Sequence, residues 1–129
     1  LEKGEVYLDR ARAKVALGDQ PGARSDFGHA VELAPTDPLA WLLSATLARR
    51  MNDLTLARQH IAQAVKLSPD DPAVALEEGN VAVLSSQDAI ARSAWERAVR
   101  LAPDSASGKA AAANLAELGP APPTTGETR

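Results

Sequence analysis

The chain has 129 residues, the length of one ordinary domain, and is 45% hydrophobic but only 3% aromatic, which is typical of closely packed helices. It contains no Cys, which excludes disulfides and thiolate sites and leaves cytoplasm and periplasm open, with the cytoplasm favoured. The net charge of −3 argues against nucleic acid, and no apolar run approaches the roughly 20 residues of a membrane span, so no membrane contact is expected.

The N-terminal part has two features of its own. The chain opens at Leu1 without a Met or a leader, so we expect it to be processed or cut from a longer protein. Arg10 and Lys14 interrupt the core-facing stripe of the first predicted helix, which indicates that this helix is a polar end of the array.

Signals for helix starts and turns divide the chain into helices of roughly a dozen residues. Asp37 and Asp71 each place a capping carboxylate before a proline, whose fixed φ suits the first residue of a helix. Turn residues begin at Gly18, Asn52 and Ser86. We therefore predict helices over residues 4–17, 21–34, 38–51, 55–68, 72–85, 89–102 and 106–118, the last with Ser105 as its cap.

A unit of 34 residues occurs three times in the sequence. The pattern Ala-Arg, Ala-Val, Leu, Pro that ends at Pro35 recurs at the same spacing, ending at Pro69 and at Pro103. Each unit contains two predicted helices. We expect one domain over residues 1–118, made of repeats 4–37, 38–71 and 72–105 and a capping helix 106–118, and a disordered Pro/Thr-rich tail over 119–129.

One face of each second helix carries a small, a large and a small apolar residue. In the first unit these are Ala23, Phe27 and Ala30, and the large residue becomes Ile61 and then Trp95. The alanines allow two helices to approach closely, and the large side chain fills the gap between them. Each hairpin is therefore expected to bury a narrow core against itself and its neighbour.

At these positions the sequence resembles the tetratricopeptide repeat family, which has a 34-residue repeat with Ala-x-x-x-aromatic and then Pro on its second helix. Ala23, Phe27 and Pro35 match, and Trp41 stands where the family has a Trp on its first helix. The resemblance covers about residues 4–118 and departs in the first helices, where the family's Leu-Gly and Tyr are mostly absent. It implies an all-α, right-handed α-solenoid of three helix hairpins plus a C-terminal capping helix, and a binding module rather than an enzyme.

Candidate residues for chemistry are few. His29 and His60 are not at equivalent places in the repeat, and we interpret both as surface residues. No phosphate loop, His-x-x-x-His pair or Gly-x-Ser-x-Gly motif occurs, so we predict no catalytic residue, metal or cofactor. Arg24, Arg58 and Arg92 form a column that we interpret as structural, each covering the next repeat and pairing with a local carboxylate; the alternative is an acid-binding stripe.

The first helices carry three columns of residues that repeat every 34 positions. In proteins that resemble this family, these helices line a concave groove, so partner binding is predicted there. Apolar anchors beside amides suit a peptide or helix of a partner protein, because an amide bonds a peptide backbone as donor and as acceptor. The predicted groove residues are Leu8, Arg12, Leu42, Thr46, Arg49, Leu76, Asn80, Val83 and Asn114, with Val15, Ala110 and Glu117 completing the columns.

Two functions remain open at this point. The leading one is a scaffold that binds a protein or peptide partner in the groove. The alternative is self-assembly into homo-oligomers through the solenoid ends, which bury no neighbour. A chaperone-tail adaptor is disfavoured, because family members with that role use a clamp of Lys, Asn and Arg where this chain has Leu8, Leu43, Ala73 and Glu77.

Overall fold

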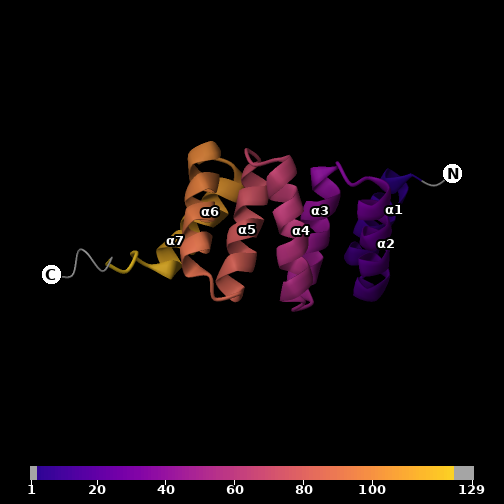
Figure 1. Ribbon diagram of the computed structural model, residues 1–129, viewed down its shortest axis with the longest axis horizontal. Helices are drawn as coiled ribbons and strands as arrows, with labels where there is room; N and C mark the ends of the chain where they lie inside the picture. The colour runs from indigo at the N-terminus through magenta and orange to yellow at the C-terminus, as the bar shows by residue number, and fades with distance from the viewer. Residues whose placement is uncertain (1–2, 124–129) are drawn as a thin grey trace.

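The computed structural model describes residues 3–123 and, within that range, contains seven helices and no strand. The helices follow one another along the longest axis, so that α1 and α2 lie at one end and α6 and α7 at the other (Figure 1). This confirms the predicted all-α solenoid of three hairpins and a closing helix. The helices are α1 (Gly4–Ala16), α2 (Gln20–Leu33), α3 (Pro38–Arg50), α4 (Leu54–Leu67), α5 (Pro72–Leu84), α6 (Asp88–Leu101) and α7 (Ala106–Leu118).

The second helix of each hairpin begins and ends one residue earlier than predicted. In α2 and α4 the reason is the cap, because Asp19 and Asp53 each accept a hydrogen bond from a backbone N–H of the first turn. Asp37, Asp71 and Ser105 cap α3, α5 and α7 in the same way, as predicted. Side-chain caps therefore fix five of the seven helix starts in the described chain.

The turn inside each hairpin has one backbone conformation in all three repeats. Gly18, Asn52 and Ser86 have φ values of 85°, 62° and 61°, in the left-handed region. The residue after each of them donates its backbone N–H to a carbonyl five residues earlier, as in the 2.8 Å bond from Asp19 to Lys14. The turn geometry is thus preserved although only Gly18 adopts it without steric cost.

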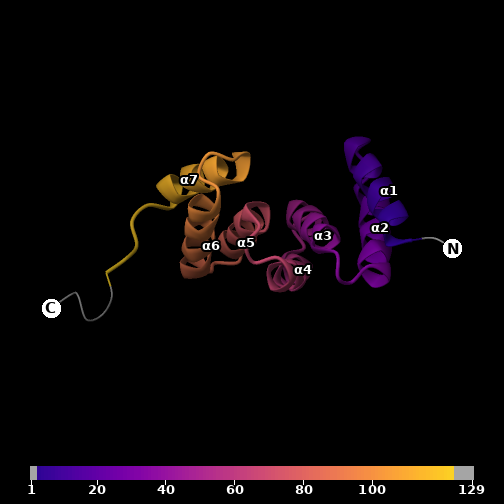
Figure 2. The same cartoon turned by 90° about the horizontal axis from the view of Figure 1, so that it is seen from above.

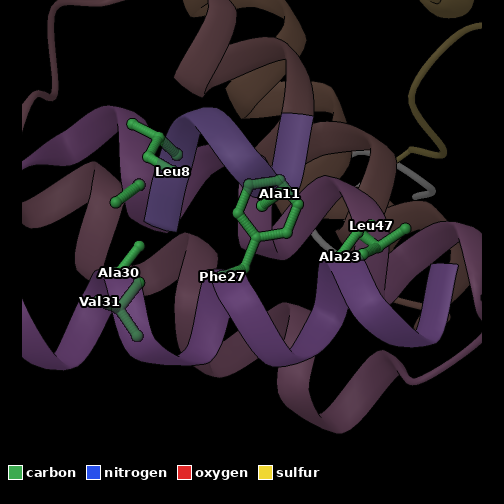
Figure 3. Close-up of a cluster of buried hydrophobic side chains, with 8 residues drawn as sticks. Leu8, Ala11, Ala23, Phe27, Ala30, Val31 and Leu47 are labelled. Atoms are coloured by element: carbon green, nitrogen blue, oxygen red, sulfur yellow. The ribbon is translucent and has the colours of Figure 1, made fainter. Parts of the chain in front are cut away.

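Each hairpin contributes a hydrophobic cluster to the core. In the first, Phe27 is 3% exposed and points from α2 toward Ala11 of α1 (Figure 3). In the third, Trp95 is also 3% exposed and packs on α5 at Gly79, where a Cβ atom would lie 2.2 Å from the indole nitrogen. The predicted core role of Trp95 is confirmed, and a glycine in the facing helix makes room for it.

Trp41 lies at the joint between the first two hairpins. Its side chain is half-buried and packs against the clusters of both hairpins. The indole Nε1–H donates to the carbonyl of Pro35, in the connection between α2 and α3, at 2.8 Å. Trp41 therefore joins two repeats through both its apolar ring and its indole N–H.

The arginine column also links neighbouring repeats. Each arginine lies on the second helix of one repeat and reaches the turn between the two helices of the next repeat, or the end of α7. The column therefore has the predicted structural role, but only the first arginine uses a carboxylate. The bonds are Arg24 to Asp53 (2.5 Å), Arg58 to the hydroxyl of Ser85 (3.1 Å) and Arg92 to the carbonyl of Gly119 (2.8 Å).

The sequence suggested that Arg10 and Lys14 make α1 a polar end of the array. In the structure, both residues instead have a partner within their own hairpin. Both side chains pair with Asp26 of α2, at 3.2 and 2.8 Å, and the Asp26 side chain is only 3% exposed. Burial raises the pKa of Asp26, but hydrogen bonds and charge from Lys14 and Arg10 outweigh it and hold that pKa below its usual value. The two basic residues thus pair within their own hairpin, while their side chains stay partly exposed to water.

After α7, residues 119–123 form neither helix nor strand. Pro120, Ala121 and Pro122 line a cavity with side chains of α6, so the chain follows that helix as it leaves α7. The rest of the predicted tail, residues 124–129, lies outside the described residues. Between residues 3 and 123, no helix combines the length and apolar character needed to cross a membrane.

Candidate functional site

The odd-numbered helices form one side of the solenoid, which we call the groove face. Seen from above, α1 and α7 rise on the same side of α3 and α5, so the row is curved (Figure 2). Two cavities open on this side, one between α1 and α3 and one between α5 and α7. The predicted concave groove therefore contains two separate hollows.

The first cavity, between α1 and α3, has a volume of about 190 Å³. Phe27 and Leu47 are buried at its base, whereas Arg12 and Arg50 are exposed at its edge. The interior is therefore apolar and the rim carries positive charge. The lining residues are Arg12, Val15, Phe27, Leu43, Thr46, Leu47 and Arg50.

The second cavity, between α5 and α7, has a volume of about 330 Å³ and a more polar lining. Asn80 Oδ1 accepts hydrogen bonds from Trp95 Nε1 and from Asn114 Nδ2, each at 3.2 Å. The oxygen of Asn80 is thus occupied, and only its amide NH₂ group is left for a ligand. The lining residues are Arg49, Asn80, Val83, Leu84, Trp95, Asn114, Glu117 and Leu118.

A buried carboxylate lies between the two cavities. Glu77 of α5 is 5% exposed and accepts two hydrogen bonds from Arg49, at 2.5 and 3.1 Å, and one from the Thr46 hydroxyl at 3.0 Å. A buried charge is tolerated when it is paired and hydrogen-bonded in this way. The network joins α3 to α5 beneath the groove and fixes the orientation of the Arg49 guanidinium.

Six of the nine predicted groove residues line the cavities, and the three leucines do not. Leu8 and Leu42 are 6% and 8% exposed and belong to the clusters of the first and second hairpins. Leu76 is half-buried against the third cluster. Leu8 and Leu42 are core residues, because packing in these clusters removes them from water, whereas Leu76 stays partly exposed. Of the other six, Arg12 and Thr46 line the first cavity, and Arg49, Asn80, Val83 and Asn114 the second.

Some cavity residues were not among those predicted. Leu43, Leu47 and Arg50 are spaced i, i+4 and i+7 on α3, on the same helix face as the predicted Thr46. Leu84 lies 34 residues after Arg50 and lines the second cavity. A fourth column, one residue after the third, was therefore readable in the sequence.

The interpretation of His60 as a surface residue is wrong. Its Nδ1 lies 2.7 Å from the hydroxyl of Ser44, a buried residue of α3, and its ring meets the edge of Trp41 at 5.0 Å between centroids. Burial lowers the pKa of His60, and the negative charge of Asp53 opposes this only in part. His29, in contrast, is exposed beside the Tyr7 ring.

The neighbouring acidic residues Glu77 and Glu78 face different helices. Glu77 pairs with Arg49, whereas Glu78 pairs with Arg97 of α6 at 2.6 Å. Over residues 3–123, no group of three or more His, Asp or Glu side chains could hold a metal ion. Both carboxylates therefore have structural partners.

No protein-family model matches this chain, and neither does any curated protein. Solved structures match it well. The first TPR of Spaghetti (RPAP3) bound to the HSP90 peptide SRMEEVD has a TM-score of 0.83 at 17% identity, over 90% of each chain. The Arabidopsis OM64 TPR domain has a TM-score of 0.79 at 17% identity, over 88% of this chain and 94% of that one. The first TPR domain of human RPAP3 has a TM-score of 0.80 at 16% identity, over 89% and 88%. The chain therefore has the tetratricopeptide-repeat fold, as the sequence resemblance predicted.

Proposed function

We propose that this chain binds a segment of another protein along the groove face. The observation that carries the proposal is the pair of cavities on one side of the solenoid, lined by side chains of α1, α3, α5 and α7. A similarly folded domain, the first TPR of Spaghetti (RPAP3), has been solved with a bound peptide, which supports the class of ligand. Two separated hollows suit an extended segment that places one side chain in each.

The network around Glu77 supports this function energetically. Because Arg49 and Thr46 are already fixed by that carboxylate, a ligand need not order them on binding. Glu77 also disfavours the chaperone peptide itself as the ligand. Family members that bind chaperone tails have a clamp of Lys, Asn and Arg, and among the residues at those places in this chain are the buried Leu8 and Glu77, whose carboxylate is paired with Arg49.

Two exposed aliphatic residues provide a matched test. Leu84 is 54% exposed and lines the second cavity, whereas Ile90 is 47% exposed and lines a cavity among α4, α5 and α6. Peptides would be selected from a random library on the unmodified protein, and their affinity measured by fluorescence anisotropy for Leu84→Glu and Ile90→Glu.

We expect Leu84→Glu to weaken binding by about tenfold or more, because it places a charge where an apolar or neutral side chain docks. Ile90→Glu should bind as the unmodified protein does. Circular dichroism would verify that both variants are folded. Equal affinity in Leu84→Glu, or a loss confined to Ile90→Glu, would place the binding surface elsewhere.

Self-assembly through the solenoid ends is a second candidate, favoured by the outer side of α7. Small alanine side chains there would permit the close approach of a helix from a second copy. Light scattering over a range of concentrations tests this, since a monomer at every concentration removes the candidate. The exposed alanines are Ala106, Ala110, Ala112, Ala113 and Ala116.

A further inference from the structure

The first cavity combines an apolar interior with two cations and, among the described residues, no carboxylate. Its volume of about 190 Å³ is below the roughly 300–1,000 Å³ of pockets that enclose a drug-sized ligand. It is suited to a single bulky side chain. The chemistry around that side chain is set by Arg12 and Arg50 at the rim.

These two arginines differ from most others in the molecule. Six of the nine arginines between residues 3 and 123 pair with or bond to another group of the protein: Arg10, Arg24, Arg49, Arg58, Arg92 and Arg97. In that part of the chain, the three without such a partner are Arg12, Arg50 and Arg100. Two of the three line the same cavity.

The fold gives little reason for this placement. Arg50 lies in the last turn of α3, where a cation interacts favourably with the helix dipole. Arg12 lies two turns into α1 and has no such role. The neighbouring Arg49 shows the contrast, because it is only 22% exposed and has the Glu77 carboxylate as its partner.

We infer that the first cavity binds an acidic segment of a partner protein, with a bulky apolar side chain in the cavity and a carboxylate of the same segment at Arg12 and Arg50. This inference rests on the proposed function of the groove face. It uses charge complementarity: two unpaired guanidinium groups beside an apolar hollow select a ligand that presents both groups together.

The charges around the second cavity determine which way the bound segment runs along the groove face. There the positive charge of Arg49 is neutralised by Glu77, and Glu117 adds a carboxylate to the lining. An acidic stretch is therefore favoured at α1 and α3 and disfavoured at α5 and α7. The acidic part of the ligand lies over the first hairpin, and a neutral, hydrogen-bonding part reaches the amides of Asn80 and Asn114.

The experiment is a selection from two random peptide libraries, one displayed with a free C-terminus and one displayed internally, on four forms of the protein. These are the unmodified chain, Arg12→Glu, Arg50→Glu and Arg100→Glu, and the affinity of the selected peptides is also measured for Leu84→Glu. Arg100 is a matched control, because it is exposed and without a partner but lies on α6, away from both cavities. Anisotropy at low and high salt then gives the affinity of each selected peptide.

We expect the unmodified chain and Arg100→Glu to select peptides rich in Asp or Glu beside Leu, Ile or Phe, with affinity that falls as salt rises. Arg12→Glu and Arg50→Glu should each weaken these peptides by about tenfold or more and lose the preference for acidic residues. Enrichment only in the free C-terminus library identifies the chain terminus as the carboxylate; enrichment in both identifies Asp or Glu side chains.

Two outcomes would overturn the inference and are distinguishable from failure of the proposed function. Selected peptides that are weakened by Leu84→Glu but show no acidic preference would leave the groove as the binding face and remove the acidic ligand. An acidic preference that survives both Arg12→Glu and Arg50→Glu would place it on other residues. Peptides that are insensitive to Leu84→Glu and to both arginine variants would remove the groove function itself.

Discussion

The first and third hairpins each bury an aromatic side chain, Phe27 or Trp95, but they differ at a neighbouring contact between their two helices. In the first, a carboxylate on α2 is buried between two basic side chains of α1, in the trio of Asp26, Arg10 and Lys14. In the third, the positions equivalent to Asp26 and Lys14 are Ala94 and Ala82, both buried, so small apolar groups replace the charged ones.

The second hairpin has a contact of intermediate polarity at the same place. Ser44 and His60 lie 34 residues after Arg10 and Asp26, and they meet through a 2.7 Å hydrogen bond where the first hairpin has its ion pair. The repeat therefore specifies which positions of its two helices touch. It leaves each hairpin to satisfy that contact with a charged pair, a neutral pair or apolar groups.

The largest expected effect concerns the apolar interior of the third hairpin. Trp95→Ala should lower the free energy of unfolding by about 3–5 kcal/mol, because it removes a buried indole and leaves a cavity at Gly79. Urea unfolding followed by circular dichroism measures this. Trp95→Phe should destabilise the protein less. A change below about 1 kcal/mol in Trp95→Ala would contradict the core assignment.

A smaller effect is expected from the charged interior of the first hairpin. Asp26→Ala should lower the free energy of unfolding by about 1–3 kcal/mol, because Arg10 and Lys14 lose their partner but remain partly exposed to water. The exposed Asp9 of α1 supplies the control Asp9→Ala, which should be nearly neutral.

The titration of Asp26 gives the same comparison a pH dependence. Its pKa is held below the usual value in the folded protein, so its contribution is present above the unfolded pKa of about 3.9 and is lost as the pH falls through the folded value. The unmodified protein should therefore lose more stability in acid than Asp26→Ala. Identical acid sensitivity of the two proteins would show that the trio does not stabilise the fold.

The Ser44–His60 pair in the second hairpin should make stability depend on pH at higher pH values than Asp26 does, and with a smaller effect. Burial lowers the pKa of His60 below 6.5, so the unfolded chain binds the proton first as the pH falls. The contribution of neutral His60 is complete above that value and decreases as the pH falls toward the folded pKa. We expect the melting temperature to drop by a few degrees between pH 7.5 and 5.5, and by less in His60→Gln, whereas His29→Gln should behave as the unmodified protein.

The sequence predicted the fold well because the repeat supplies the same information three times. The turns at Gly18, Asn52 and Ser86, the caps and the alanine spacing all indicate the same hairpin. Contacts made by the side chains of polar residues were harder to predict. His60 lies at the place in the repeat equivalent to Asp26, and the hydrogen bond that each makes across its hairpin is a side-chain contact that the 34-residue period does not contain.

In the candidate site, too, the repeat predicts which helices and columns take part, but not how a single side chain packs. The helices that line the groove follow from the repeat, and so does the polar column that contains Arg12 and Asn80. Whether a leucine on such a helix faces its own hairpin or the groove depends on packing that a one-dimensional period does not contain. Leu42 was therefore predicted as an anchor and is buried, whereas Leu84 was not predicted and lines a cavity.

The smallest expected effect concerns the chain that follows the third hairpin. Arg92 holds the end of α7 through the carbonyl of Gly119, the first residue after the helix, and not through the prolines beyond it. A chain ending at Gly119 keeps an acceptor for Arg92, because the new terminal carboxylate takes the place of the peptide carbonyl. Its melting temperature should thus stay within about 1 °C of that of the full chain, since residues 120–123 are exposed.

Arg92→Ala should lower the melting temperature of the full chain more, by the equivalent of about 0.5–1.5 kcal/mol for one lost hydrogen bond. Differential scanning calorimetry on the two proteins separates these effects, and a drop of several degrees on truncation alone would mean that the Pro-containing segment stabilises α6.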